Sequence, residues 1–382
     1  MFTSSPGRVN RGLRHTASQM TISAGLPKWP HLPISKRMPM NTPPSSQPVA
    51  LTEANIHMTK FFSKVCIVGA GAIGGWLGAG LARAGCDVSV LARGATLAAL
   101  QLKGLSLGNA THPVTARSDA AAVGVQDLVV VAVKAPGLRE VARQIGPLIG
   151  PHTVVLTAMN GVPWWFFQGF GGALAGTHLT AVDGTGEIAT AIAARHVIGC
   201  VVHASCSVDA PGAIRHHFGN GLIIGEPSGE VTQRVQALAA LLVRAGFAAT
   251  VSPQIQKDVW YKLWGNMTVN PISALTGATT DLILGDELVR NFVSAVMLEA
   301  KEIGARIGIP IDQQPADRHQ VTLKLGAFKT SMLQDVEAGK AVELDALVTV
   351  VKELGTLTGV ATPFTDALLG LSRLQARVRG IY

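Results

Sequence analysis

Short hydrophobic runs alternate with longer helical stretches between residues 64 and 158. The strand-like runs are VCIV (65–68), DVSVLA (87–92), DLVVVAV (127–133) and TVVLTA (153–158). Helices are expected between them, one running to Arg83 and one near residues 137–149. Strands that alternate with helices predict a right-handed, doubly wound parallel sheet.

Residues 196–225 have a different pattern, with closely spaced β segments and no long helix between them. These segments are HVIGCVVHASCSV, AIRHHF and LIIGEP. Turn residues separate them at Pro211-Gly212 and at Gly219-Asn220-Gly221, which predicts an antiparallel extension of the sheet. A helix at about 230–245 and a last strand near 248–251 follow.

From Ser252-Pro253 the pattern is helical almost to the end of the chain. Serine is a favoured helix cap and proline fits the first helical turn, so a helix is expected to start there. We therefore predict an α/β domain over residues 58–252 and an all-helical domain over residues 253–382.

The first 57 residues have no periodic pattern and hold eight of the 20 prolines, with many Ser, Thr and Asn residues. They also carry six basic residues and one acid, so they supply much of the net charge of +8. We interpret them as a disordered or non-native extension without a catalytic role. A targeting segment, or a natural start at Met58, remains an alternative.

Composition excludes several classes of protein. The remaining basic residues form no aromatic-interleaved patch, which argues against nucleic-acid binding. Residues 65–82 are uncharged, but six of them are glycines, so a membrane helix is not expected. The four cysteines lack metal-ligand spacing, and we expect no metal. Reduced thiols fit a cytoplasmic protein.

A glycine motif lies directly after the first strand, where a helix should begin. It comprises Gly69, Ala70, Gly71, Ala72, Ile73 and Gly74. In the GxGxxG pattern the first glycine makes a tight turn, the second lets a pyrophosphate approach the backbone, and the third packs helix on strand. The motif therefore predicts a dinucleotide site at a helix N-terminus.

The second strand ends at Arg93, where an NAD site would carry an acid for the ribose hydroxyls. A guanidinium pairs well with a 2′-phosphate. The expected cofactor is therefore NADP(H). An ordinary surface role for Arg93 is the alternative.

Polar residues follow two later strands, at the edge where ligands bind in this sheet class. Lys134 ends the run DLVVVAVK, and Asn160-Gly161 ends the next strand. Each is a weak signal alone, because turns also favour such residues.

Lys262, Asn266 and Asn270 are spaced by four residues in WYKLWGNMTVNP and share one helix face. Apolar residues surround this stripe, so it needs polar partners, and a ligand could supply them. Pro271 should end or kink the helix. Ser331 and Glu343 lie on either side of Gly339, and both are expected near helix termini.

Over about residues 64–372 the chain resembles the ketopantoate reductase (2-dehydropantoate 2-reductase) family. The matching segments occur in family order: GAGAIG, Arg93, VK at 133–134, NG at 160–161, KLWGNMTVNP at 262–271, SMLQD at 331–335 and ELD at 343–345. The resemblance implies a Rossmann-type domain followed by a helical domain, with cofactor and substrate between them.

The resemblance also implies roles for individual residues. Lys262 resembles the general acid, and Glu343 the carboxylate that orients it and meets the substrate hydroxyl. Lys134 and Asn160 resemble residues that contact both cofactor and substrate. Asn266, Asn270 and Ser331 resemble further substrate-binding residues. The implied reaction is NADPH-dependent reduction of 2-dehydropantoate to pantoate in pantothenate biosynthesis.

Two features leave the substrate open. Met159 stands where the family often has a polar residue, and the aromatic run VPWWFF (162–167) follows Asn160-Gly161. Both would make a pocket rim more apolar, unless the run simply packs beneath a loop. The alternatives are a reductase of another small 2-keto acid, a 3-hydroxy-acid dehydrogenase type of enzyme, and a non-catalytic NADP-binding sensor. No membrane partner is expected, and a homodimer is an open alternative to a monomer.

Overall fold

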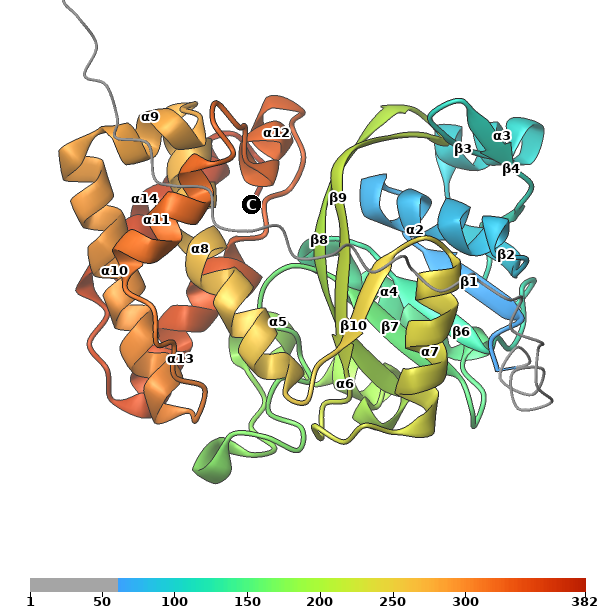
Figure 1. Cartoon of the computed structure of the whole chain (residues 1–382), viewed down its shortest axis with the longest axis horizontal. Helices are drawn as coiled ribbons and strands as arrows, with labels where there is room; N and C mark the ends of the chain where they lie inside the picture. The colour runs from blue at the N-terminus through green and yellow to red at the C-terminus, as the bar shows by residue number, and fades with distance from the viewer. Residues whose placement is uncertain (1–60) are drawn as a thin grey trace, which may run out of the picture. The chain divides into compact units, whose positions relative to one another are not determined.

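The computed structural model describes residues 61–382 of the chain. The extension predicted for residues 1–57 lies outside the described residues, so its interpretation stays a prediction. The described part consists of a mixed sheet with covering helices, followed by a helical region (Figure 1).

The centre of the sheet has the predicted parallel arrangement. Strands β1 (Lys64–Val68), β2 (Asp87–Leu91), β6 (Leu128–Val131) and β7 (Val154–Ala158) correspond to the four predicted runs. They pair in parallel in the order β7-β6-β1-β2. Short strands form the two opposite edges of the sheet. At one edge β5 (Thr115–Arg117) pairs with β2, and at the other edge β3 (Leu105–Leu107) and β4 (Ala110–His112) follow β9 (Ala213–Gly225).

Alternation along β1 buries both faces of the sheet. Cys66 and Val68 belong to the larger hydrophobic core, which extends into the helical region. Val65 and Ile67 belong to a second core beneath α2 (Ala72–Arg83) and α7 (Gln233–Arg244). Because both faces of the central strands are covered, their runs are continuously apolar.

The helix predicted near residues 137–149 is shorter than expected. It is α4 (Leu138–Gln144), with one-turn 3-10 segments at Ala135–Gly137 and Gly146–Leu148 on either side. Pro136 and Pro147 lack the backbone N–H that a longer α-helix would use, which favours these short turns. The remaining helices of this region are α3 (Gly94–Lys103), α5 (Thr180–Asp183) and α6 (Glu187–Ala191).

Residues 196–225 form one long antiparallel hairpin, β8 (Val197–Ala210) with β9 (Ala213–Gly225). The predicted turn at Pro211-Gly212 is confirmed. The predicted turn at Gly219-Asn220-Gly221 is wrong, because these residues lie inside β9. The pairing shifts opposite them, between His203 and Ser205, and Gly219 adopts φ +75°. Glycine here makes a bulge rather than a turn. The predicted last strand is β10 (Ala248–Val251), parallel to β9.

Helix α8 (Ile255–Thr276) is the central element of the helical region and contacts β8, α10, α12 and α14. The other helices are α9 (Thr280–Gly285), α10 (Glu287–Arg306), α11 (Pro315–Leu323), α12 (Ser331–Glu337), a π-helical turn η5 (Asp345–Thr349), α13 (Val350–Thr358) and α14 (Pro363–Val378). The all-helical pattern expected after residue 253 is confirmed.

Two details of α8 differ from the prediction. The helix starts at Ile255 rather than at Pro253, and Ser252 stabilises the start from outside by accepting from Gln254 N and donating to Asp258. Pro271 does not end the helix, which continues to Thr276. The surrounding turn, residues 267–274, is buried. This packing stabilises the helix despite the hydrogen bond that proline removes.

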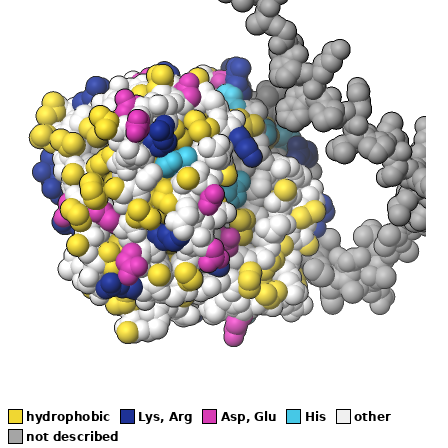
Figure 2. Space-filling model, turned by 60° about the vertical axis from the view of Figure 1, so that its left-hand side comes forward, with side chains coloured by type: hydrophobic (Ala, Val, Ile, Leu, Met, Phe, Trp, Pro, Cys, Tyr) yellow, Lys and Arg dark blue, Asp and Glu magenta, His cyan; other side chains and the backbone are white. Residues whose placement is uncertain are grey.

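Within residues 61–382, no helix is both long and apolar enough to cross a membrane. The uncharged stretch 65–82 forms β1, the glycine turn and most of α2. On the face drawn in Figure 2, basic and acidic side chains are interspersed among hydrophobic ones.

Candidate active site

The glycine motif forms the turn between β1 and α2, and its glycines have the three expected geometries. Gly69 adopts φ +102°, which disfavours other residues. A Cβ on Gly74 would lie 1.9 Å from the carbonyl oxygen of Gly69, so helix and turn are in close contact. A Cβ on Gly71 would meet nothing within 4 Å. That open space, next to Ala72 and Ile73 in the first turn of α2, suits a phosphate.

A cavity of about 490 Å³ extends from this turn along the ends of β1 and β2. Gly69, Ala70, Gly71 and Arg93 all line it. Arg93 occupies the N-cap position of α3 without a capping hydrogen bond from its side chain, which is 62% exposed. Its guanidinium donates to Glu140 Oε1 at 3.2 Å and to Gln144 Oε1 at 2.8 Å. Arg93 thus lies in the same cavity as the glycine turn, beside a carboxylate that sequence analysis did not single out.

Two contacts of the residues that follow β6 join this part of the sheet edge to the helical region. The ammonium of Lys134 forms an ion pair with Asp335 of α12. The next backbone N–H, of Ala135, donates to Glu343 Oε1 at 3.0 Å. Glu343 is buried, and burial raises the pKa of its carboxyl group. It lies at the start of the helical segment that continues into η5, as predicted.

Lys262 projects from α8 to the ends of the parallel strands. Its amine donates to Asn160 Oδ1 at 2.8 Å and to the carbonyl oxygen of Val202 on β8 at 2.7 Å. Removal from water lowers the pKa of Lys262 to about 8, with Glu343 opposing the shift. Lys262 and Glu343 do not form an ion pair, so direct orientation of the lysine by this carboxylate is not what the structure shows. Asn160 and the Val202 carbonyl hold it instead.

The rest of the predicted polar stripe continues along α8. Asn266 is half-buried and Asn270 is 6% exposed. Within residues 61–382, neither carboxamide has a hydrogen-bond partner. Ser331 is exposed at the first turn of α12, which packs against α8. Thr330, not Ser331, caps that helix.

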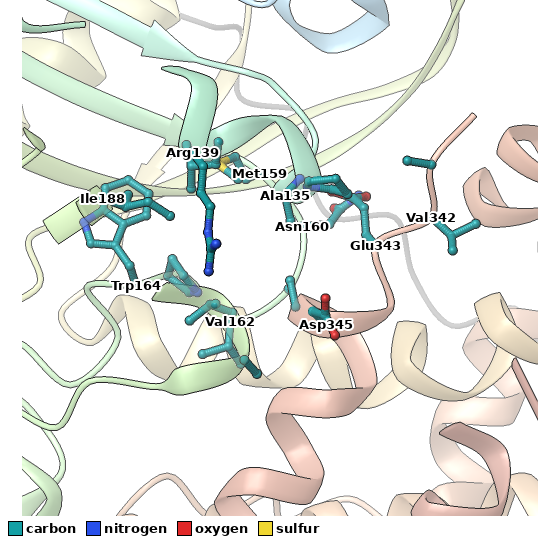
Figure 3. A pocket seen from close by; sticks show the side chains of 18 of the residues that line it. Ala135, Arg139, Met159, Asn160, Val162, Trp164, Ile188, Val342, Glu343 and Asp345 are labelled. Carbon is teal, nitrogen blue, oxygen red and sulfur yellow. The ribbon is translucent and has the colours of Figure 1, made fainter. Parts of the chain in front are cut away.

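A second cavity, of about 590 Å³, lies between the ends of β6 and β7 and the segment around Glu343. Figure 3 shows Asn160 and Glu343 on one side of it and Trp164 and Ile188 on the other. The run at 162–167 is divided between two roles. Val162, Trp164 and Trp165 line this cavity, whereas Phe166 and Phe167 are fully buried core residues that do not.

No cluster of His, Cys, Asp or Glu suited to a metal ion occurs in the part of the chain from 61 to 382. All four cysteines are free, and Cys66 and Cys200 are buried. Burial raises the pKa of each of these two thiols to about 12.

Sequence analysis missed several groups because they depend on tertiary structure. The Val202 carbonyl and the Ala135 N–H are backbone atoms, which carry no residue signal. Arg318 of α11 lies against α8 near Lys262, and a helical arginine ordinarily indicates only a surface position. A glycine inside α8, Gly265, is the one sequence feature that suggests a close approach there.

A cavity at the glycine turn, together with a buried lysine between a Rossmann-type sheet and a helical region, is typical of a nicotinamide-dependent oxidoreductase. Comparison with known proteins narrows this class. The model of the family "Ketopantoate reductase PanE/ApbA" matches residues 65–166, and that of its C-terminal region matches residues 254–376.

Individual relatives agree over most of the chain. A 2-dehydropantoate 2-reductase of Mesorhizobium japonicum is 48% identical over 84% of this chain and 99% of its own. The crystal structure of a Ralstonia solanacearum protein, assigned as a ketopantoate reductase, is 57% identical with a TM-score of 0.80, covering 84% of this chain and all of that one. A 2-dehydropantoate 2-reductase from Geobacter metallireducens is 28% identical with a TM-score of 0.72, covering 81% and 99%. The chain belongs to the ketopantoate reductase family.

Proposed function

We propose that this enzyme uses NADPH to reduce a 2-keto acid, with 2-dehydropantoate as the first substrate to test and pantoate as its product. The observation that carries the proposal is the position of Lys262. Its amine has a lowered pKa and lies at the sheet edge, where it donates to Asn160, a residue that lines the second cavity.

The cofactor fits the residues that are present. The open backbone at Gly71 leaves room for the pyrophosphate, and Arg93 in the same cavity suits the 2′-phosphate of NADPH. Glu140 must release Arg93, at least in part, for that contact to form. Asn160 and Glu343 line the second cavity, which would hold the nicotinamide end. When bound, NADPH supplies the hydride that the reaction requires.

Lys262 can then protonate the substrate. A ketone gains negative charge on its oxygen as C2 is reduced, and a positioned ammonium stabilises that charge and transfers its proton. An ammonium has three N–H donors, and Asn160 and Val202 accept from two of them. The third is available for the ketone oxygen. The product is a 2-hydroxy acid, and the lysine is left as a neutral amine.

Asn266, Asn270 and Ser331 would hold the polar groups of the substrate. Their side chains extend from Lys262 along α8 to α12, and the two carboxamides need partners that the described residues do not supply. The relatives named 2-dehydropantoate 2-reductase support that substrate. The apolar wall formed by Val162 and Trp164 favours a second candidate, a more apolar 2-keto acid.

One assay tests the proposal. The purified protein is mixed with NADPH and 2-dehydropantoate, then with a panel of 2-keto acids, and nicotinamide absorbance is followed. Oxidation of NADPH with 2-dehydropantoate is the expected result. Turnover only with other 2-keto acids would replace the substrate but keep the chemistry. If NADPH binds and no 2-keto acid is reduced, a non-catalytic sensor becomes the better account.

A further inference from the structure

Arg318 lies against α8 at a glycine. If Gly265 carried a Cβ, that atom would lie 2.8 Å from both Nε and Nη2 of the guanidinium. The Cζ atom is 5.2 Å from the ring centroid of Tyr261, one turn earlier on α8. The guanidinium therefore occupies space that α8 leaves open only because residue 265 has no side chain.

This cation has no counter-ion in the described part of the chain. Its Nε is buried without a hydrogen-bond partner, and no carboxylate among residues 61–382 lies within ion-pair distance of it. Burying a charge without a partner is costly, so an arginine held in this way is suited to an anion that arrives from outside.

The position of Arg318 relates it to the site described above. Gly265 lies about 60° around the helix from Lys262, on the flank of the polar stripe, and next to Asn266 in sequence. Burial is the main cause of the lowered pKa of Lys262 and of His203 on β8, and the charge of Arg318 adds to the effect at both groups. The contact with Gly265 places the guanidinium on α8 within one helical turn of Lys262.

We propose that Arg318 binds the carboxylate of the 2-keto acid while Lys262 faces its ketone oxygen. The inference rests on the proposed function and adds a residue to it. In a 2-keto acid the carboxylate and the ketone are on adjacent carbons, so their binding groups must be neighbours. A planar guanidinium can donate two parallel hydrogen bonds to a carboxylate and so fix the plane of the substrate. The enzyme would thereby select 2-keto acids over neutral ketones and 2-keto amides.

The test uses the full-length protein with Arg318→Gln and Arg318→Lys variants. Oxamate, a non-reactive carboxylate analogue of a 2-keto acid, is titrated calorimetrically in the presence of NADP+. Removing a charge-assisted bidentate contact should weaken oxamate binding, and raise KM for the 2-keto acid, about 100-fold in Arg318→Gln. Lysine should restore part of the loss. The preference for the acid over its amide, measured as a ratio of kcat/KM, should fall by a similar factor.

Arg306→Gln is the matched control, because Arg306 is an exposed arginine of the same helical region that pairs with Glu302. The thermal unfolding temperature and the Kd for NADPH should match those of the wild type in both Arg318→Gln and Arg306→Gln. If Arg318→Gln proves unstable, Gly265→Ala provides a second variant, since the added methyl group displaces the guanidinium and should raise KM about 10-fold.

Two results would overturn the inference. One is wild-type turnover of 2-keto acids together with an unchanged KM and an unchanged acid-to-amide ratio in Arg318→Gln, which leaves the proposed function intact. The other is a wild-type protein that binds NADP+ but neither oxamate nor any 2-keto acid, which removes the proposed function as well.

Discussion

The glycine turn and the surroundings of Lys262 are built in opposite ways. The turn comes from one continuous strand–turn–helix segment, and its requirements are steric: a positive φ at Gly69, a close contact at Gly74 and open backbone at Gly71. Around Lys262, by contrast, side chains and backbone of α8, β7 and β8 come together, and α8 is far from both strands in the sequence. The requirements there are electrostatic, because Lys262 needs hydrogen-bond partners and a lowered pKa.

Because of this difference, we expect the two regions to contribute to different steps, one to cofactor binding and the other to proton transfer. In the proposed function, the glycine turn binds the part of the cofactor that does not react. In the same proposal, the ammonium of Lys262 acts on the reacting atoms. Its contacts and its lowered pKa exist only where the helical region packs on the sheet. Substitutions in the two regions should therefore affect different measurements.

The largest effect is expected from Lys262→Ala. Loss of the general acid should lower kcat about 10³-fold, while the Kd for NADPH should change by no more than about twofold. Stopped-flow turnover and fluorescence titration of NADPH give the two numbers. Lys257→Ala, an exposed lysine of the same helix, is the control. If Lys262→Ala also abolished NADPH binding, the two regions would not be separable.

Substitutions in the glycine turn should separate fold from binding. Gly74→Ala forces a methyl group onto the Gly69 carbonyl and should cost about 1–3 kcal/mol of unfolding free energy or more. Gly71→Ala meets no protein atom and should leave stability within about 0.5 kcal/mol while weakening NADPH binding. Chemical denaturation and cofactor titration distinguish the two. Equal loss of stability in both variants would refute the assignment of the open space to the cofactor.

A smaller effect is expected from Arg93→Gln. Without the guanidinium, NADPH should bind about 10-fold more weakly, because one charge-assisted contact to the 2′-phosphate is lost. Binding of NADH should stay the same, since it lacks that phosphate. Arg143→Gln, another exposed arginine that pairs with Glu140 and Glu187, is the control. An identical change in the Kd for NADPH and for NADH would show that Arg93 does not bind the 2′-phosphate.

The two regions also differ in how well they could be predicted. The glycine turn, the four central strands and the stripe of Lys262, Asn266 and Asn270 follow from local patterns, so sequence analysis placed them. Gly219 was misread because glycine serves both turns and bulges, and only the pairing of β8 with β9 decides between them. Pro271 does not end α8, one of the two predicted outcomes, because burial of the helix outweighs the local preference of proline.

The partners of Lys262 could not be predicted. The Val202 carbonyl is a backbone atom, and Glu343 bonds to Ala135 rather than to the lysine. The contact of the Arg318 guanidinium with Gly265 likewise joins two helices that are distant in the sequence. Such contacts depend on how distant segments pack, which no local pattern in this chain specifies.

The central claim is that Lys262 donates a proton during reduction, and the dependence of kcat/KM on pH tests it most directly. Because removal from water lowers the pKa of Lys262 to about 8, the ammonium required as acid is lost as the pH rises through that value. The rate of reduction should therefore decline above about pH 8, and oxidation of the 2-hydroxy acid, which needs the neutral amine, should increase over the same range. A rate of reduction that stays constant up to pH 10, or a Lys262→Ala variant with the same alkaline decline, would contradict the account.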